Sequence, residues 1–377
     1  MIQKVFFKLK ERFVGMGLYN IITLSLTICM LIAILVLGIV LHIGKNALPD
    51  QLMAGRWSKE GDVAQVSCFY SKEAYVTEDS IGQMRYNLER KMQEQALVPN
   101  TDTARLYIDA YSAEGNITIQ SDKKSIEANV IGIGGDFFLF HPVELLSGMY
   151  FSGNDLMQDS VLLDEEAAWQ LFGSNDIAGK TVTIYGMPYR VAGVYSREQG
   201  DLETMAGSKD TTIYMSYSAL ASLNGCNITC YEVVMPNPVE GFALDNISEV
   251  NVSSEENVKM VENSNRFSYI SLYNIWTERA SRSMKTDDIV FPFWENLARV
   301  KEESLMEVAL WQICMICILA IYWSVRLMIF IIKHKPNAQT FVKIWEYCIE
   351  KLRLWHKKAK EKKAARKEKE LNTYIEF

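Results

Sequence analysis

The residues best suited to chemistry form a glycine-rich run that contains Gly173, Gly179, Lys180 and Thr181. A phosphate-binding loop has four residues between its two glycines, and its backbone N–H groups surround the phosphates. Here five residues separate Gly173 from Gly179, so the ring of N–H groups has the wrong size. The flanks are also reversed, because a helical pattern precedes the run and a strand pattern follows it. We therefore expect no nucleotide at Lys180.

Two cysteines, Cys226 and Cys230, are the other candidates for chemistry. In an oxidising compartment they would close a small disulfide loop, and otherwise they are a pair of free thiols. Both alternatives are open. The chain has neither a G-x-S-x-G nor an H-E-x-x-H motif, and these are the common signatures of serine hydrolases and zinc proteases. We expect a protein that is not an enzyme and that carries no cofactor.

Two long apolar runs predict membrane spans. Residues 20–43 contain no charged side chain and would reach about 36 Å as a helix, enough to cross a bilayer core of about 30 Å. This run is longer than the apolar part of a signal peptide and no small-residue cleavage site follows it, so we interpret it as a retained anchor. The second run, residues 308–332, contains Arg326 as its single charge. That side chain would extend to the membrane interface or pair inside a bundle.

Charge predicts the orientation of the two spans. The flanking segments, residues 1–19 and 333–377, are basic, whereas the intervening residues 44–305 are acidic. Basic flanks stay in the cytoplasm. We expect a two-pass protein of a bacterial plasma membrane, with both termini cytoplasmic and residues 44–305 outside. The four histidines, His42, His141, His334 and His356, then lie on both sides of the membrane or within it, so we expect no metal site.

The outer segment alternates between strand and helix patterns. Thr77 is a good N-cap for a helix that runs to about Gln95, with Ile81, Met84, Leu88 and Met92 on one stripe. Further helices are predicted over residues 164–172 and 217–223, and strands over 104–112, 117–121, 125–133, 211–216 and 231–236, with a hairpin over 181–195 around Gly186-Met187-Pro188. We place turns at Glu114-Gly115-Asn116 and at residues 122–124, and residues 241–285 stay unassigned. The fold class is an α+β extracytoplasmic domain, a mixed sheet with helices, inserted between two transmembrane α-helices.

The stretch from Val130 to Tyr195 resembles the periplasmic core domain of MacB/FtsX-type ABC transporter permeases. The matching positions are Gly132, Asp136, Phe137, Phe138, Gly148, Asp155, Leu171, Phe172, Gly173, Gly179, Lys180 and Gly193. In that family the Gly-Lys pair is a turn into a hairpin. The resemblance implies a permease-like membrane subunit of an ABC-type transport or mechanotransmission assembly. Its partners would be membrane lipid, a cytoplasmic ABC ATPase subunit and a second permease subunit.

The number of spans differs from that family's pattern. Such permeases carry one span before the outer domain and three after it, whereas only one apolar run follows the outer segment here. A second interpretation is therefore a two-span membrane scaffold or sensor, which uses the outer domain as a binding module without transport.

The basic tail has an apolar stripe at helical spacing, formed by Phe341, Trp345, Cys348, Leu352 and Trp355. Such a helix would lie on the anionic inner leaflet, dock on an ATPase, or stay solvated. No nucleic-acid-binding motif accompanies its lysines, so we expect no nucleic-acid partner.

The charge pattern generates a test of the orientation. In intact cells, a membrane-impermeant thiol reagent should label a cysteine placed at Ser121 and should not label one placed at Gln3, because only Ser121 is predicted to lie outside. Labelling of the Gln3 site from outside would reverse the topology.

Overall fold

The structure is a computed structural model, and it describes residues 17–58, 62–97, 105–153, 155–197, 200–206, 211–278, 285–286, 288–334, 349–351 and 353–354. The chain divides into two compact units, residues 32–312 and residues 1–31 with 313–377. The tail positions Phe341, Trp345, Leu352 and Trp355 lie outside the described residues, as does most of the predicted N-terminal segment 1–19. Their roles stay predictions.

Two helices, α2 (Leu18–Lys45) and α11 (Phe293–His334), are long and apolar enough to cross a membrane. Helix α11 begins at Phe293 and not near Val308, because Trp294, Leu297 and Ala298 are buried in the cores of the sheet unit. Arg326 Nη2 donates to Asn20 Oδ1 at 2.7 Å, so its side chain contacts the start of α2.

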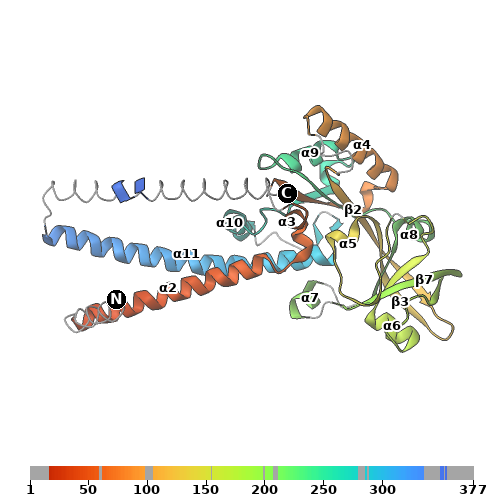
Figure 1. Cartoon of the computed structure of the whole chain (residues 1–377), viewed down its shortest axis with the longest axis horizontal. Coiled ribbons are helices and arrows are strands. Elements are labelled where there is room, and N and C mark those ends of the chain that lie inside the picture. Colours follow the sequence, from red (N-terminus) through yellow and green to blue (C-terminus); the bar gives the residue numbers. More distant parts are fainter. Residues whose placement is uncertain are drawn as a thin grey trace, which may run out of the picture. The chain divides into compact units, whose positions relative to one another are not determined.

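A ten-stranded mixed sheet makes up most of the larger unit (Figure 1). Its strand order in the described residues is β10-β1-β9-β2-β3-β8-β5-β7-β4, with β6 pairing both β2 and β7. The pairs β3–β8 and β5–β7 are parallel and the other pairs are antiparallel, so the predicted mixed sheet with helices is confirmed. The strands are β1 (Val63–Tyr70), β2 (Ile108–Gln120), β3 (Ser125–Gly135), β4 (Leu145–Gly148), β5 (Ser160–Asp164), β6 (Thr181–Ile184), β7 (Met187–Tyr195), β8 (Thr212–Ser216), β9 (Cys230–Pro236) and β10 (Val258–Glu262), and β11 (Lys285–Thr286) and β12 (Ile289–Val290) form a separate pair.

Helices cover both faces of this sheet. One face carries α4 (Glu78–Glu94), α6 (Glu165–Phe172), α8 (Tyr217–Asn224) and α9 (Phe242–Val250). The other face carries α3 (Met53–Trp57), α5 (Phe137–Phe140) and the start of α11. The remaining helical elements are α7 (Asp201–Ala206), α10 (Tyr269–Glu278) and the 3-10 turns η1 (Pro49–Gln51), η2 (Lys72–Ala74) and η3 (Glu255–Asn257).

Helix α4 follows its sequence pattern closely. Thr77 caps it, and Thr77 and Ser80 exchange side-chain and backbone hydrogen bonds in a capping box. The stripe of Ile81, Met84, Leu88 and Met92 is fully buried against the sheet. The predicted start, end and buried face of this helix are confirmed.

The predicted turn at Glu114-Gly115-Asn116 is wrong, because β2 runs straight through it. Gly115 pairs with Val130 of β3. A Cβ at Gly115 would lie 3.4 Å from Val130 Cγ1 and 3.8 Å from Leu220 Cδ1 of α8, which are ordinary van der Waals distances, so the extended strand has room for a side chain here. Long-range pairing therefore overrides the local turn signal. The unassigned residues 241–285 form α9, β10 and α10.

The glycine-rich run connects α6 to a β-hairpin. Asp164 caps α6, and Gly173 ends it at a φ of 70°. Strands β6 and β7 are joined at Tyr185 and Gly186, whose φ values of 48° and 82° are left-handed, one residue earlier than the predicted turn. The N–H groups of Gly179 and Lys180 are already paired, since Gly179 N donates to Val191 O at 2.7 Å and Lys180 N donates to Ile177 O at 3.0 Å.

This geometry predicts that Lys180 plays no part in nucleotide binding. The ammonium lies 5.1 Å from the centre of the Phe172 ring, a contact worth about 0.5–1 kcal/mol at an exposed site. Isothermal titration with ATP should detect no binding to the wild-type protein or to Lys180→Ala, and the variant should unfold at nearly the same temperature. ATP binding that disappears in Lys180→Ala would contradict this.

Candidate functional site

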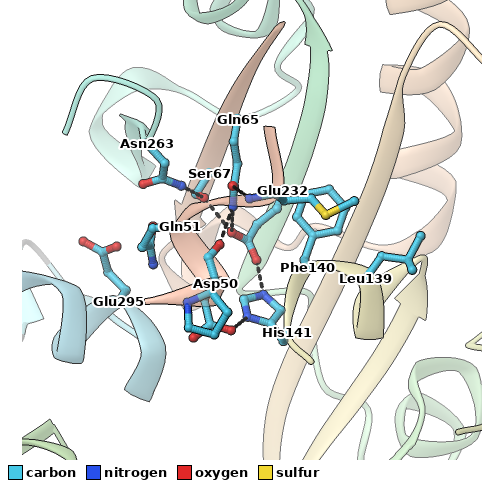
Figure 2. A network of polar contacts seen from close by, with 12 residues as sticks. Asp50, Gln51, Gln65, Ser67, Leu139, Phe140, His141, Glu232, Asn263 and Glu295 are labelled. Atoms are coloured by element: carbon cyan, nitrogen blue, oxygen red, sulfur yellow. Dashed lines mark hydrogen bonds and ion pairs between the residues drawn. The ribbon is translucent and has the colours of Figure 1, made fainter. Parts of the chain in front are cut away.

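The sheet unit encloses a histidine that lies between two carboxylates. His141 follows α5, Asp50 lies on η1 just after α2, and Glu232 lies on β9. His141 Nδ1 is 2.8 Å from Asp50 Oδ1, and Nε2 is hydrogen-bonded to Glu232 Oε2. All three side chains are buried, and Figure 2 shows them facing one another. Three elements that are distant in sequence therefore meet at one ionisable group.

Uncharged side chains extend this cluster along β1. Ser67 Oγ donates to Glu232 Oε1 at 2.6 Å, and Asn263 Nδ2 donates to Ser67 Oγ at 2.8 Å. Gln65 Nε2 donates to the Asp50 carbonyl at 2.7 Å, and its Oε1 accepts from the Met53 N–H at 3.0 Å. The Gln65 bonds tie the segment after α2 to strand β1 (Figure 2).

Asn263 leads to a second charged cluster around Arg266, in the loop after β10. Arg266 Nη1 donates to Asn263 Oδ1 at 3.1 Å. Its guanidinium forms a bidentate pair with Glu295 at 2.6 and 2.7 Å, and its Nε donates to Glu302. Both glutamates belong to α11 and all three charged groups are buried.

We call these connected side chains the buried polar network; its members are Asp50, Gln51, Gln65, Ser67, His141, Glu232, Asn263, Arg266, Glu295 and Glu302. It joins η1, which continues from α2, and the first turns of α11 to strands β1 and β9. Arg266 also reaches Gln51 Oε1 of η1 at 3.4 Å. The network therefore holds both segments that lead to the apolar helices.

The surroundings keep His141 protonated. Burial alone would lower its pKa, but the adjacent Glu232 and Asp50 outweigh burial and raise the pKa to about 9. As an imidazolium it donates from both ring nitrogens, so no lone pair remains for a general base. Ser67 donates to Glu232 and not to the imidazole. The arrangement is suited to neutralising buried charge rather than to activating a nucleophile.

A cavity of about 640 Å³ lies beside the network, and Asp50, His141 and Trp294 are among its lining residues. The Trp294 ring lies 4.3 Å from the His141 ring, centre to centre. Among the described residues, no group of three or more His, Cys, Asp or Glu side chains has an arrangement that could hold a metal ion.

Most positions of the family motif lie in the sheet half away from the network. Asp136 precedes α5 and its Oδ2 lies 2.6 Å from Arg105 Nη1. Phe137 is the motif residue that reaches the network, since its ring lies 4.6 Å from the His141 ring. Phe138 stacks on Tyr150 at 4.7 Å, and Asp155 is exposed. On α6, Leu171 is buried and Phe172 lies under Lys180.

The motif glycines permit close backbone approaches. Gly148 and Gly193 face each other across β4 and β7. A Cβ on Gly148 would lie 2.2 Å from Ala192 O, and one on Gly193 would lie 2.5 Å from Ser147 O. A Cβ on Gly132 would lie 2.7 Å from Leu220 Cδ2 of α8. These positions shape the sheet and place no functional group at its surface.

Sequence reasoning missed the network, although two of its members carry a signal. Glu232 lies within an otherwise apolar strand, and Gln65 lies within the apolar β1. Charged and amide side chains in such strands are expected to have buried partners. The identity of those partners depends on contacts between distant segments.

Cys226 and Cys230 are free thiols in the structure. Cys230 is buried on the face of the sheet that carries α5, whereas Cys226 packs on the opposite face near α8. Burial raises the pKa of both thiols. The disulfide that an oxidising compartment would favour stays a prediction.

Known proteins are similar to the first apolar helix and most of the sheet unit of this chain. The family model described as "MacB-like periplasmic core domain" matches residues 20–262. The macrolide export ATP-binding/permease protein MacB of Chromobacterium violaceum is 32% identical over 100 residues, which are 26% of this chain and 15% of that protein. A MacB 2 protein of Yersinia pestis is 35% identical over 88 residues, 22% of this chain and 13% of that protein. The chain thus spans a small part of the length of these relatives.

Two solved structures are similar to the chain. The periplasmic region of MacB from Actinobacillus actinomycetemcomitans covers 58% of this chain and 94% of its own, at 17% identity and a TM-score of 0.39. The extracellular domain of the noncanonic ABC-type transporter YknZ from Gram-positive bacteria covers 52% of this chain and 99% of its own, at 15% identity and a TM-score of 0.34.

The raised pKa of His141 predicts a pH dependence of stability. Protonated His141 stabilises the folded state fully below its unfolded pKa of about 6.5, and this contribution is lost as pH rises through about 9. Between these values the free energy of unfolding should fall by about 3 kcal/mol. Thermal unfolding of the full chain in detergent, followed from pH 6 to 10, measures the slope.

His141→Gln should be less stable at pH 6.5 and should lose most of this slope, because Gln cannot carry the charge that both carboxylates require. The matched control is His42→Gln, which changes an exposed histidine near the end of α2. Equal slopes in wild type and His141→Gln would show that His141 does not titrate in this range.

Proposed function

Because the chain belongs to the MacB-like periplasmic core domain family, we propose that it is a permease-like membrane subunit of an ABC-type transport or mechanotransmission assembly. Its outer domain relays motion that a partner ATPase drives through the apolar helices. In this role the chain itself carries no catalytic site. Its partners are membrane lipid, the cytoplasmic ATPase and a second permease subunit.

The buried polar network is the observation that carries this proposal. Arg266 receives Glu295 and Glu302 from α11, and His141 receives Asp50 from the segment after α2. Removing one partner of a buried ion pair typically costs about 3–5 kcal/mol, several times the thermal energy. A displacement of α11 or η1 therefore moves β1 and β9 with it more readily than it opens the network. A connection of this kind would pass motion of the apolar helices on to the sheet.

The orientation is part of the same proposal. Both termini lie in the cytoplasm of a bacterial cell, and residues 44–305 lie outside the membrane. The basic flanks and the acidic middle of the sequence support this arrangement.

The second candidate is a two-span scaffold or sensor that uses the outer domain as a binding module without transport. The observation that favours it is the number of apolar helices, since two in the described residues are long enough to cross a membrane. A scaffold needs no ATPase, so the two candidates differ in what binds the chain.

Purification from native membranes separates these candidates. The full chain, tagged and solubilised in mild detergent, should bring down an ATP-binding subunit in a fixed ratio. Mass spectrometry of the eluate identifies it, and an unrelated two-span protein with the same tag is the control. An eluate with no ATP-binding subunit, from membranes that contain the ATPase, would favour the scaffold.

The relay itself is tested in the purified complex by hydrogen exchange. ATP should change the exchange of backbone amides in β1 and β9, and Glu302→Gln should remove most of that change while the ATPase stays bound. This variant keeps the Arg266–Glu295 pair, so the domain should still fold. The matched control is Arg85→Gln, which breaks the 2.6 Å pair between α4 and Asp109 of β2 without touching α11 or η1. Equal responses in the two variants would count against the network as the relay.

A further inference from the structure

Helix α10 exposes a continuous stripe of large apolar and aromatic side chains. Ile270, Tyr273 and Trp276 are 76%, 53% and 49% exposed. At the helical period of about 100° per residue, Trp276, Tyr269, Tyr273 and Ile270 fall within one arc of about 120°. The rings of Tyr273 and Trp276 also contact each other, at 5.8 Å between centres. An apolar stripe of this kind usually marks an interaction surface.

The opposite side of α10 fixes the helix against the start of α11. Leu272 is 1% exposed, and Ile275 packs on the same cluster, which includes Leu305 and Met306 of α11. Tyr269 donates from its hydroxyl to Gln312 Oε1 at 2.7 Å. The Lys45 ammonium, at the end of α2, lies 5.0 Å from the centre of the Tyr269 ring. The exposed stripe is therefore held in place and is not a frayed end.

The Tyr269 bond places α10 at a defined depth along α11. Glu307 is exposed and is the last acidic residue before the apolar run 308–332. Gln312 follows Glu307 by five residues, which is about 7.5 Å along the helix axis. Gln312 also donates to Ile34 O at 3.1 Å, within the apolar run of α2. The Tyr269 hydroxyl thus reaches into the apolar run, past the last charge. Leu272 and Ile275 of the same helix pack on the cluster that contains Leu305 and Met306, on the other side of Glu307.

From this placement we propose that α10 lies in the headgroup layer of the bilayer, at the surface where α2 ends and α11 enters its apolar run. Ile270, Tyr273 and Trp276 contact lipid there. Tyr and Trp are the side chains enriched at this depth, because each combines an apolar ring with a polar atom. Lys45 and Glu307 supply charges at the same level. The contact anchors the sheet unit to the membrane surface whether or not an ATPase binds the chain.

Depth-dependent fluorescence quenching tests this contact. The full chain is reconstituted into vesicles whose phosphatidylcholine carries bromine near the headgroup or deep in the acyl chain. The signal of Trp276 is the difference between wild type and Trp276→Phe, a change that keeps an aromatic ring. Trp169→Phe is the matched control. Trp169 is 58% exposed on α6, and the proposal gives its side chain no contact with lipid.

Shallow bromine should quench the Trp276 signal about two-fold more than deep bromine, as expected for a side chain at headgroup level. The Trp169 signal should respond to aqueous acrylamide and to neither lipid. Two results would overturn the proposal. A Trp276 signal that responds to acrylamide as strongly as that of Trp169 would mean a solvated helix, and one that responds to neither quencher would mean contact with another protein chain.

Discussion

The charge of Arg266 constrains much of the larger unit. A guanidinium removed from water needs anionic partners with good geometry, since its desolvation would otherwise exceed any gain from packing. Here the partners come from α11, which begins before its apolar run and so brings Glu295 and Glu302 to the sheet unit. Trp294, in the first turn of α11, packs against His141. The start of α11 and the residues of η1 therefore meet in one network of buried charged and polar groups.

The two halves of the sheet differ in the residues that they contain. The half built from β3, β8, β5 and β7 contains the family motif, and its glycines allow strands and α8 to approach closely. The half around β1 and β9 contains the charged residues and receives the segments from α2 and α11. The contacts to α11 and η1 thus lie in the second half.

Local pattern accounts for the elements that are stabilised locally. The stripe and cap of α4, the hairpin after Gly179 and the helix after Asp164 could be predicted because neighbouring residues determine them. The path of β2 through Gly115 could not, because pairing with β3 outweighs the turn signal. The buried polar network could not be predicted either. Its pairs, such as Arg266 with Glu295 and His141 with Glu232, come together only when the chain has folded. Helix α10 was missed because apolar side chains lie on both its buried and its exposed sides, so its sequence YISLYNIWTE has no single apolar stripe.

The position of β1 has a consequence for biogenesis. This strand is early in the chain, yet it lies between β9 and β10, and its neighbours are synthesised much later. At about 5–20 residues per second, β9 follows β1 from the ribosome by roughly 10–30 s. During that interval the apolar strand VAQVSCFY has both edges unpaired, a state prone to wrong pairing. Strand β1 therefore stays open to wrong pairing until β9 and β10 have been synthesised.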